Sequence, residues 1–238
     1  MSAEVHGLEE FYASPPGAVA TRLLGARLRV LWPDLTGLDW LGLGWAAPFA
    51  PLWRGQRGRR LLLAPDTLGH RRMPGCGPPY ARPCALVEER RLPLPDRSLD
   101  RILLVHGLEA SSHPRLLLRE CWRVLRDDGR LIVAAPNRLG PWAQFEHTPF
   151  GQGQPYSEGQ LGRLLEAQLF RVERREAALF VPPFPWRGAL RGAGLWEKAG
   201  RGMTRRLGGL VVLEAEKDLF AAMPAGAVSL RRRVVMAR

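Results

Sequence analysis

The clearest pattern of apolar and polar positions lies between residues 92 and 137. Ile102–Val105 is an uninterrupted apolar run, typical of a parallel strand whose two faces are both covered. A helix is predicted to begin at Pro114, because proline is well tolerated at the first helical position. A second apolar run, Leu131–Ala135, follows. The pattern predicts a strand, a helix and a second strand, which is the repeating unit of an open α/β sheet.

The predicted helix has one apolar side and one basic side, with Ser112 or His113 as its N-cap. We expect the apolar side to be buried against the sheet, and the arginines Arg119 and Arg123 to be exposed and cheap to replace. Asp127-Asp128-Gly129 is predicted to end the helix in a turn whose glycine adopts positive φ. The apolar side consists of Leu117, Leu118, Cys121, Trp122, Val124 and Leu125, and the basic side of Arg115, Arg119, Arg123 and Arg126.

Cap residues and apolar runs predict further helices and strands. Ser14-Pro15 is predicted to cap a helix that runs to about Val30, and Ser157 opens a helix with a leucine stripe. Further strands are predicted at Leu38–Leu41, Arg60–Ala64, Cys84–Val87, Phe170–Val181 and Leu210–Ala215.

The segment from LPLPDRSLD to PRLLLRECWRVLRDDGRLIVAAPN resembles class I S-adenosylmethionine-dependent methyltransferases of the type 11 methyltransferase domain family. The resemblance covers residues 38–175. It implies an α/β, Rossmann-like, seven-stranded sheet of order 3-2-1-4-5-7-6, with strand 7 antiparallel and helices on both faces. It also implies S-adenosyl-L-methionine as cofactor. We expect a single domain over 1–238, with residues 1–37 as an N-terminal helical cover and 182–208 as an insertion between strands 6 and 7.

The glycine loop after the first strand departs from the family's D-x-G-x-G-x-G pattern. Gly44 matches the first loop glycine, while Gly42 stands where the acidic residue is expected. Ala46 and Pro48 replace the second and third glycines, and Pro48 is compatible with the first turn of a following helix. In the family that helix points its N-terminus at the cofactor's carboxylate. Taken alone, a glycine at a strand end is more often an ordinary turn than a ligand loop, and its place before the segment 92–137 is what favours the loop here.

Polar residues after the next strands match the family's cofactor contacts. Asp66, 22 residues after Gly44, stands where a carboxylate holds the ribose hydroxyls. Glu88, with Glu89 beside it, stands where the adenine amino group is held. His106 follows the fourth strand, at the crevice where the strand order reverses. The alternatives are a turn for Asp66, a solvated charge pair for the glutamates and a structural role for His106.

No motif marks the methyl acceptor. The catalytic residues are unknown, and His106 and His147 are weak candidates for the base. LVHGLE stands in place of an NPPY-like tetrad after strand four, which argues against amino-methylation of adenine or glutamine. The aromatic segment 141–156 is either a substrate lid or a loop anchored to the core, and 182–208 is either a lid, a peripheral membrane contact or ordinary packing. The glycines of 182–208 argue against a stable helix there.

Composition limits the alternatives further. The 238 residues carry a net charge of +12, but only two of the 35 basic residues are lysines, and no aromatic-basic platform for nucleic-acid bases is apparent. Cys76, Cys84 and Cys121 lack metal-ligand spacing, so we expect no metal site. The cysteine content and the lack of a signal sequence or spanning run favour a cytoplasmic protein. The oligomeric state is not indicated.

These observations favour S-adenosylmethionine-dependent methyl transfer to a small-molecule or lipid-like acceptor. A methyltransferase-fold protein that has lost catalysis and serves in binding or regulation is the alternative, motivated by the altered loop GLGWAAP. A basic nucleic-acid-binding protein on the same fold is a third.

Overall fold

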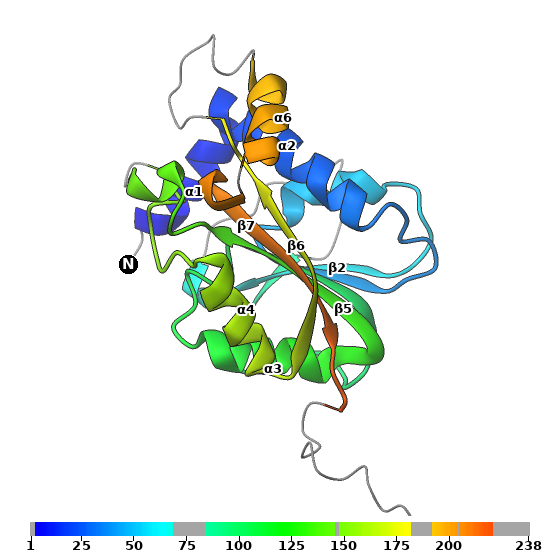
Figure 1. Ribbon diagram of the computed structural model, residues 1–238. Helices are drawn as coiled ribbons and strands as arrows, with labels where there is room; N and C mark the ends of the chain where they lie inside the picture. Colours follow the sequence, from blue (N-terminus) through cyan, green and yellow to red (C-terminus); the bar gives the residue numbers. More distant parts are fainter. Residues whose placement is uncertain (1–2, 69–83, 146–147, 182–191, 204, 221–238) are drawn as a thin grey trace, which may run out of the picture.

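The computed structural model describes residues 3–68, 84–145, 148–181, 192–203 and 205–220 of the chain (Figure 1). Seven strands form one sheet of order β3-β2-β1-β4-β5-β7-β6. β1 to β5 pair in parallel, and β7 is antiparallel to both of its neighbours. The predicted strand order and the antiparallel strand are therefore confirmed. The strands are β1 Trp40–Gly44, β2 Arg60–Pro65, β3 Cys84–Val87, β4 Leu99–Val105, β5 Leu125–Pro136, β6 Phe170–Ala178 and β7 Leu210–Lys217.

Helices cover both faces of the sheet, as Figure 1 shows. α2 and α6 lie over one face and α3 and α4 over the other, with α1 beside α2. The helices are α1 Ala3–Ala13, α2 Pro15–Leu31, α3 Pro114–Val124, α4 Glu158–Glu166 and α6 Ala193–Met203, with 3₁₀ turns η1 Ala47–Trp53, η2 Asp66–Leu68, η3 Pro141–Gln144 and η4 Arg205–Leu207.

The strand sequence divides the core between these two layers. Side chains alternate along β1, so Trp40 packs with α2 and η1 while Leu41 and Leu43 pack with the layer that contains α3. Both neighbours of β4 are parallel strands, and Ile102 to Val105 are fully buried. The continuous apolar run of β4 thus fills both layers, as predicted.

The N-terminal helices begin with well-defined local signals. Ser14 accepts a hydrogen bond from the backbone N–H of Gly17 and caps α2, which confirms the predicted cap. The preceding helix α1 was not predicted. At α4, Ser157 and Gln160 form a reciprocal capping box. His113 precedes α3 without a side-chain cap bond, and Pro114 occupies the first turn, where its missing N–H costs little.

The predicted turn at Asp127-Asp128-Gly129 is wrong. α3 ends at Val124, and Leu125 is already extended and paired with Leu99 of β4, so the three residues lie inside β5. The register shifts between Leu99 and Arg101, and this irregularity accommodates the extra residues of β5. Gly129 does not adopt positive φ. A Cβ there would lie 2.8 Å from the carbonyl oxygen of Arg126, so close packing requires the glycine.

The expectation that 182–208 forms no stable helix is also wrong for part of the segment. Residues 182–191 lie outside the described residues, but 193–203 form α6. A Cβ on Gly200 would lie 2.3 Å from the ring of Phe180, so this glycine lets the helix approach the strand exit closely. Glu197 of α6 is buried, accepts a hydrogen bond from the backbone N–H of Phe180 and pairs with Arg27 of α2. Tertiary packing has overridden the weak local propensity.

Arg123 is a structural arginine, in contrast to the expectation that it is exposed and cheap to replace. Its guanidinium donates to the backbone oxygens of Leu92 and Leu94 and to the carboxylates of Glu120 and Asp96. It therefore ties α3 to the loop that precedes β4. The Glu120 and Asp96 carboxylates raise the pKa of this guanidinium above its usual value.

We expect Arg123→Ala to lower the free energy of unfolding by about 1–3 kcal/mol, because hydrogen bonds to charged groups are lost and two carbonyl groups lose their donor. Arg119→Ala is the matched control, since Arg119 is exposed on the same helix, and it should change stability by less than about 0.5 kcal/mol. Urea unfolding measures both. Equal effects for the two variants would contradict the structural role of Arg123.

Candidate active site at the carboxyl end of β4

A buried chain of hydrogen-bonding side chains lies where β4 ends. His106 is 2% exposed, and its Nδ1 lies 2.6 Å from Oε1 of Glu109. Its Nε2 lies 2.8 Å from the hydroxyl oxygen of Tyr12, which belongs to α1. The backbone of His106 has φ 51°, a left-handed value that is uncommon outside glycine. Strained backbone of this kind is concentrated at functional sites.

The partners of His106 assign its tautomer. A carboxylate can only accept, so Nδ1 carries the hydrogen and donates it to Glu109. Burial, together with the nearby Glu109 carboxylate, raises the pKa of Tyr12 far above its usual value, so the phenol keeps its proton. Nε2 then has a free lone pair and accepts from Tyr12. This arrangement is a histidine oriented by a carboxylate, with its basic nitrogen directed at a hydroxyl group.

Aromatic rings surround this chain. Tyr12 contacts the rings of His106 and Trp45, and Phe11 contacts Trp142 and Phe150. Trp142 and Phe150 are 3% and 0% exposed, and the indole N–H of Trp142 donates to the carbonyl oxygen of Val181. These two rings anchor the segment 141–156 to the core, which is the alternative that the sequence left open for this loop. The N-terminal helix α1 covers the crevice through Phe11 and Tyr12.

The loop after β1 is tightly packed. Gly44 has φ +76°, and a Cβ there would lie 2.2 Å from the carbonyl oxygen of Val105, so only glycine fits. A Cβ on Gly42 would lie 2.6 Å from the side chain of Leu62, so this position is tightly packed. Ala46 is fully buried. The departures at Gly42 and Ala46 therefore follow from packing between β1, β2 and η1.

The segment that follows the loop differs from the expected α-helix. Residues 47–53 form the short 3₁₀ turn η1, with Pro48 in its first turn and Pro51 inside it. Proline removes backbone donors and prevents a regular α-helix. No helix N-terminus is therefore available at Ala47 to hold a carboxylate in the way the family resemblance implies.

The acidic residues predicted to contact the cofactor do not all lie together in the structure. Asp66 is exposed directly after β2, and Glu88 is exposed directly after the neighbouring strand β3. Glu89 is buried and accepts a hydrogen bond from the hydroxyl of Ser111. Asp66 and Glu88 thus lie at one edge of the sheet, whereas Glu89 holds the loop after β4. His147 lies outside the described residues.

The fit of S-adenosylmethionine can be tested at this crevice. Exposed carboxylates stand at the ends of β2 and β3, and two buried polar atoms, Trp45 Nε1 and Glu109 Oε2, have no hydrogen-bond partner among the described residues. Unpaired buried atoms at a crevice are typical of a site that receives a polar ligand. The hollow beside His106 and Glu109 measures only about 20 Å³, however, which is the space of a single water molecule. The residues fit the cofactor in kind, whereas the space described beside His106 is much smaller than the cofactor.

Tyr12 and Glu109 were missed by the sequence analysis. Glu109 carries a local signal, because it stands three residues after His106 in LVHGLE, a spacing that lets the two side chains meet across a turn. Tyr12 carries none, since 94 residues separate it from His106.

Other chemistry is limited within the described part of the chain. No group of histidine, cysteine and acidic side chains there could hold a metal ion, and no helix is long and apolar enough to cross a membrane. Cys121 is buried in the core, and burial raises the pKa of its thiol to about 12, so it is not a nucleophile. On α6, Leu195 and Trp196 are exposed. Peripheral membrane contact through 182–208 stays a prediction.

Comparison with known sequences supports one family. Residues 80–133 match the model of the family described as "Methyltransferase domain". A Mycolicibacterium smegmatis protein described as "Probable S-adenosylmethionine-dependent methyltransferase/" is 34% identical over 84 residues, which are 34% of this chain and 32% of that protein. An uncharacterized Mycobacterium tuberculosis protein is 30% identical over 99 residues, 39% of this chain and 35% of its own length. The chain thus spans about a third of these relatives.

Solved structures resemble the fold over most of its length. A SAM-dependent methyltransferase from Thermotoga maritima has a TM-score of 0.62 at 19% identity, covering 88% of this chain and 94% of that one. A SAM-dependent methyltransferase from Archaeoglobus fulgidus has a TM-score of 0.58 at 18% identity, covering 83% and 94%. The chain thus has the Rossmann-like fold of these S-adenosylmethionine-dependent methyltransferases, and its residues 80–133 match the methyltransferase domain family.

Proposed function

We propose that the chain transfers a methyl group from S-adenosylmethionine to a proton-bearing nucleophile, such as a hydroxyl group, on a small-molecule or lipid-like acceptor. The observation that carries this proposal is the chain Tyr12–His106–Glu109 at the carboxyl end of β4. Ligands of open α/β sheets bind at this end of the strands, beside the point where the strand order reverses. A basic imidazole nitrogen already accepts from a hydroxyl group there.

Different residues would bind the cofactor and accept the proton. Asp66 and Glu88, exposed at the ends of β2 and β3, would hold the cofactor's ribose hydroxyls and adenine. Gly44 keeps the loop after β1 close to β4. The cofactor, when bound, supplies an activated methyl group on a sulfonium sulfur. His106 accepts the acceptor's proton at Nε2, and Glu109 holds the imidazole in the required tautomer and stabilises the imidazolium that forms.

Tyr12 occupies the position of the acceptor's hydroxyl group in the described conformation. Its O–H donates to Nε2, which is the interaction that a hydroxyl-bearing acceptor requires. α1 would therefore move as cofactor and acceptor enter. Closing segments of this kind exclude water from active sites.

A second candidate function is a methyltransferase-fold protein that has lost catalysis and serves in binding or regulation. The observation that favours it is the small cavity beside His106, together with the buried Trp45 and Ala46 where the family has an open glycine loop. In this view the chain Tyr12–His106–Glu109 only fixes α1 to the sheet.

Titration calorimetry with S-adenosylhomocysteine separates the two. We expect binding, and we expect Asp66→Ala to weaken it by about 1.5–3 kcal/mol, the range for hydrogen bonds to a charged group. Asp34→Ala is the matched control, because Asp34 is an exposed aspartate that accepts hydrogen bonds from Thr36 just after the end of α2, and it should leave the dissociation constant unchanged.

The calorimetric results distinguish an active methyltransferase from a protein that has lost catalysis. No heat of binding with the wild-type protein would favour the decayed enzyme. Binding that Asp66→Ala leaves unchanged would remove Asp66 from the cofactor site and retain the proposal only for the remaining residues.

A further inference from the structure

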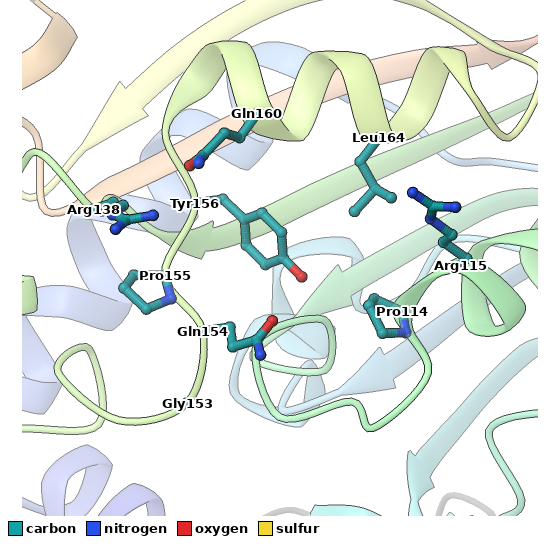
Figure 2. A pocket seen from close by; sticks show the side chains of 9 residues that line it. All are labelled: Pro114, Arg115, Arg138, Gly153, Gln154, Pro155, Tyr156, Gln160 and Leu164. Carbon is teal, nitrogen blue, oxygen red and sulfur yellow. The ribbon is translucent and has the colours of Figure 1, made fainter.

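A second, larger hollow lies beside the active-site crevice. It measures about 560 Å³, within the range of small-molecule sites, and opens between the first turns of α3 and α4, the exit of β5 and the loop 153–156. Figure 2 shows Arg115 and Arg138 on opposite sides of this groove, with the ring of Tyr156 between them. The candidate cofactor contacts Gly44, Asp66 and Glu88 do not line it.

The groove is basic. Arg115 lies in the first turn of α3, and Arg138 follows β5. Both are exposed, and neither guanidinium has a carboxylate partner among the described residues. This contrasts with Arg123, Arg126 and Arg130, each of which pairs with acidic side chains. No acidic side chain lines the groove. Two cations that face one hollow without an anion favour an acidic ligand.

The floor between the arginines is partly apolar and offers hydrogen-bond donors. Pro114 and Leu164 lie beside the half-buried ring of Tyr156, and in Figure 2 the amide of Gln160 lies above the ring and that of Gln154 below it. Burial, with a smaller contribution from Glu109, raises the pKa of Tyr156, so its phenol keeps its proton and can donate. The lining therefore suits a body with an apolar or flat centre.

The groove adjoins the His106–Glu109 pair through one loop. Gly153 lines both the groove and the small cavity beside His106. Its φ is +70°, and a Cβ there would lie 2.5 Å from the carbonyl oxygen of Glu109, so the loop packs directly on Glu109. The next backbone N–H, that of Gln154, donates to the same oxygen. A molecule in the groove would rest on the loop that holds Glu109.

We propose that this groove binds an elongated small molecule with an acidic group, carboxylate or phosphate, at each end, one paired with Arg115 and the other with Arg138, and with its apolar centre on Tyr156. The proposal concerns binding alone and does not depend on methyl transfer. The arginines supply charge and planar donor pairs, which recognise carboxylate and phosphate with matching geometry.

The test uses para-phenylenediacetate as the two-ended acid, phenylacetate as the one-ended acid and benzyl alcohol as the neutral analogue. Calorimetry at low ionic strength should show the two-ended acid binding about tenfold or more tighter than phenylacetate, with no measurable binding of the alcohol. Arg115→Gln and Arg138→Gln should each weaken the two-ended acid by about tenfold or more and reduce its advantage over phenylacetate. The double variant should lose binding.

Arg163→Gln is the matched control, because Arg163 is an exposed arginine on α4 that does not line the groove, and its affinity should stay at the wild-type value. Melting temperatures verify that all variants are folded.

Phenylphosphate in place of phenylacetate determines whether carboxylate or phosphate is preferred at one end, and a clear preference for either supports the site. The proposal is overturned if the wild type binds the two-ended acid no better than the alcohol, or if the double variant binds it like the wild type. Because S-adenosylhomocysteine is absent from every titration, such a failure leaves the proposed methyl transfer intact. In the same way, a failure to bind S-adenosylhomocysteine leaves the proposed acid-binding groove intact.

Discussion

Replacing His106 by asparagine is expected to lower turnover by about a hundredfold to ten-thousandfold, the usual contribution of a general base. Asparagine retains a polar side chain in the buried crevice but has no nitrogen that can accept a proton. In the proposed mechanism Nε2 of His106 takes the acceptor's proton, and in the described conformation this nitrogen accepts from the Tyr12 hydroxyl. The loss should therefore appear in kcat, while the affinity for S-adenosylhomocysteine stays close to that of the wild type.

The assay follows transfer of a labelled methyl group from S-adenosylmethionine into an extract of small molecules and lipids. His113→Asn is the matched control, because His113 is a second histidine that precedes α3, lies outside the crevice and directs its ring at Arg90. Turnover that survives His106→Asn would exclude the imidazole as the base.

Glu109→Gln separates orientation from proton acceptance. Glutamine can still accept from Nδ1–H, but its neutral amide can also turn its donor toward the ring and favour the other tautomer. We expect a smaller loss of turnover than for His106→Asn, and a shift of the imidazole ¹⁵N resonances toward hydrogen on Nε2. Unchanged imidazole resonances would show that Glu109 does not position the ring.

The parts of the fold that the sequence predicts correctly are those where one local rule and the tertiary environment agree. Ile102–Val105 is apolar throughout because neighbouring strands and helices cover it on both sides. Ser14 and Pro114 mark helix starts because the first turn of a helix has unpaired N–H groups. Such signals are independent of distant residues, which is why this buried strand and the helix starts follow from them. The strand order, in contrast, was an expectation from the family resemblance, and the structure confirms it.

The sequence predictions fail where contacts between residues far apart in the chain determine the local structure. Gly129 is expected from the sequence to end the helix with positive φ, but it lies within β5, between Leu125 and Arg130, which both pair with β4. Glycines argued against a helix over 193–203, yet Gly200 is what lets α6 pack against Phe180. Arg123 was placed at the surface by helical periodicity, although four partners from other turns and loops bind it.

The candidate site likewise contains residues that local patterns predict and residues that only the fold brings together. The position of His106 follows from the end of β4 and the family's strand order, and the structure places it in a buried crevice. Its most informative neighbour, Tyr12, comes from a helix that no local pattern connects to β4. The basic groove, likewise, joins Arg115 to Arg138 across the exits of two strands. Each residue alone is an ordinary surface arginine, and only the fold brings them to one hollow.

Leu117→Ala is expected to lower the free energy of unfolding by about 2–5 kcal/mol, the range for removing a large aliphatic side chain from a core. Leu117 is completely buried on α3 and packs in the core layer that contains Leu104, Val133 and Leu161. The surrounding strands are paired on both sides and cannot collapse fully into the space left by the lost methyl groups. The cavity therefore adds to the lost transfer free energy of the side chain.

Leu116→Ala is the matched control, because it makes the same change in the preceding residue, which is 42% exposed. It should alter stability by less than about 0.5 kcal/mol, since most surface substitutions do. Urea unfolding with a common m-value compares the two variants directly. If Leu116→Ala were the more damaging change, the inward face of α3 would be misassigned, and the packing of α3 against β4 and β5, which positions the loop that carries His106 and Glu109, would have to be rebuilt from the opposite face of the helix.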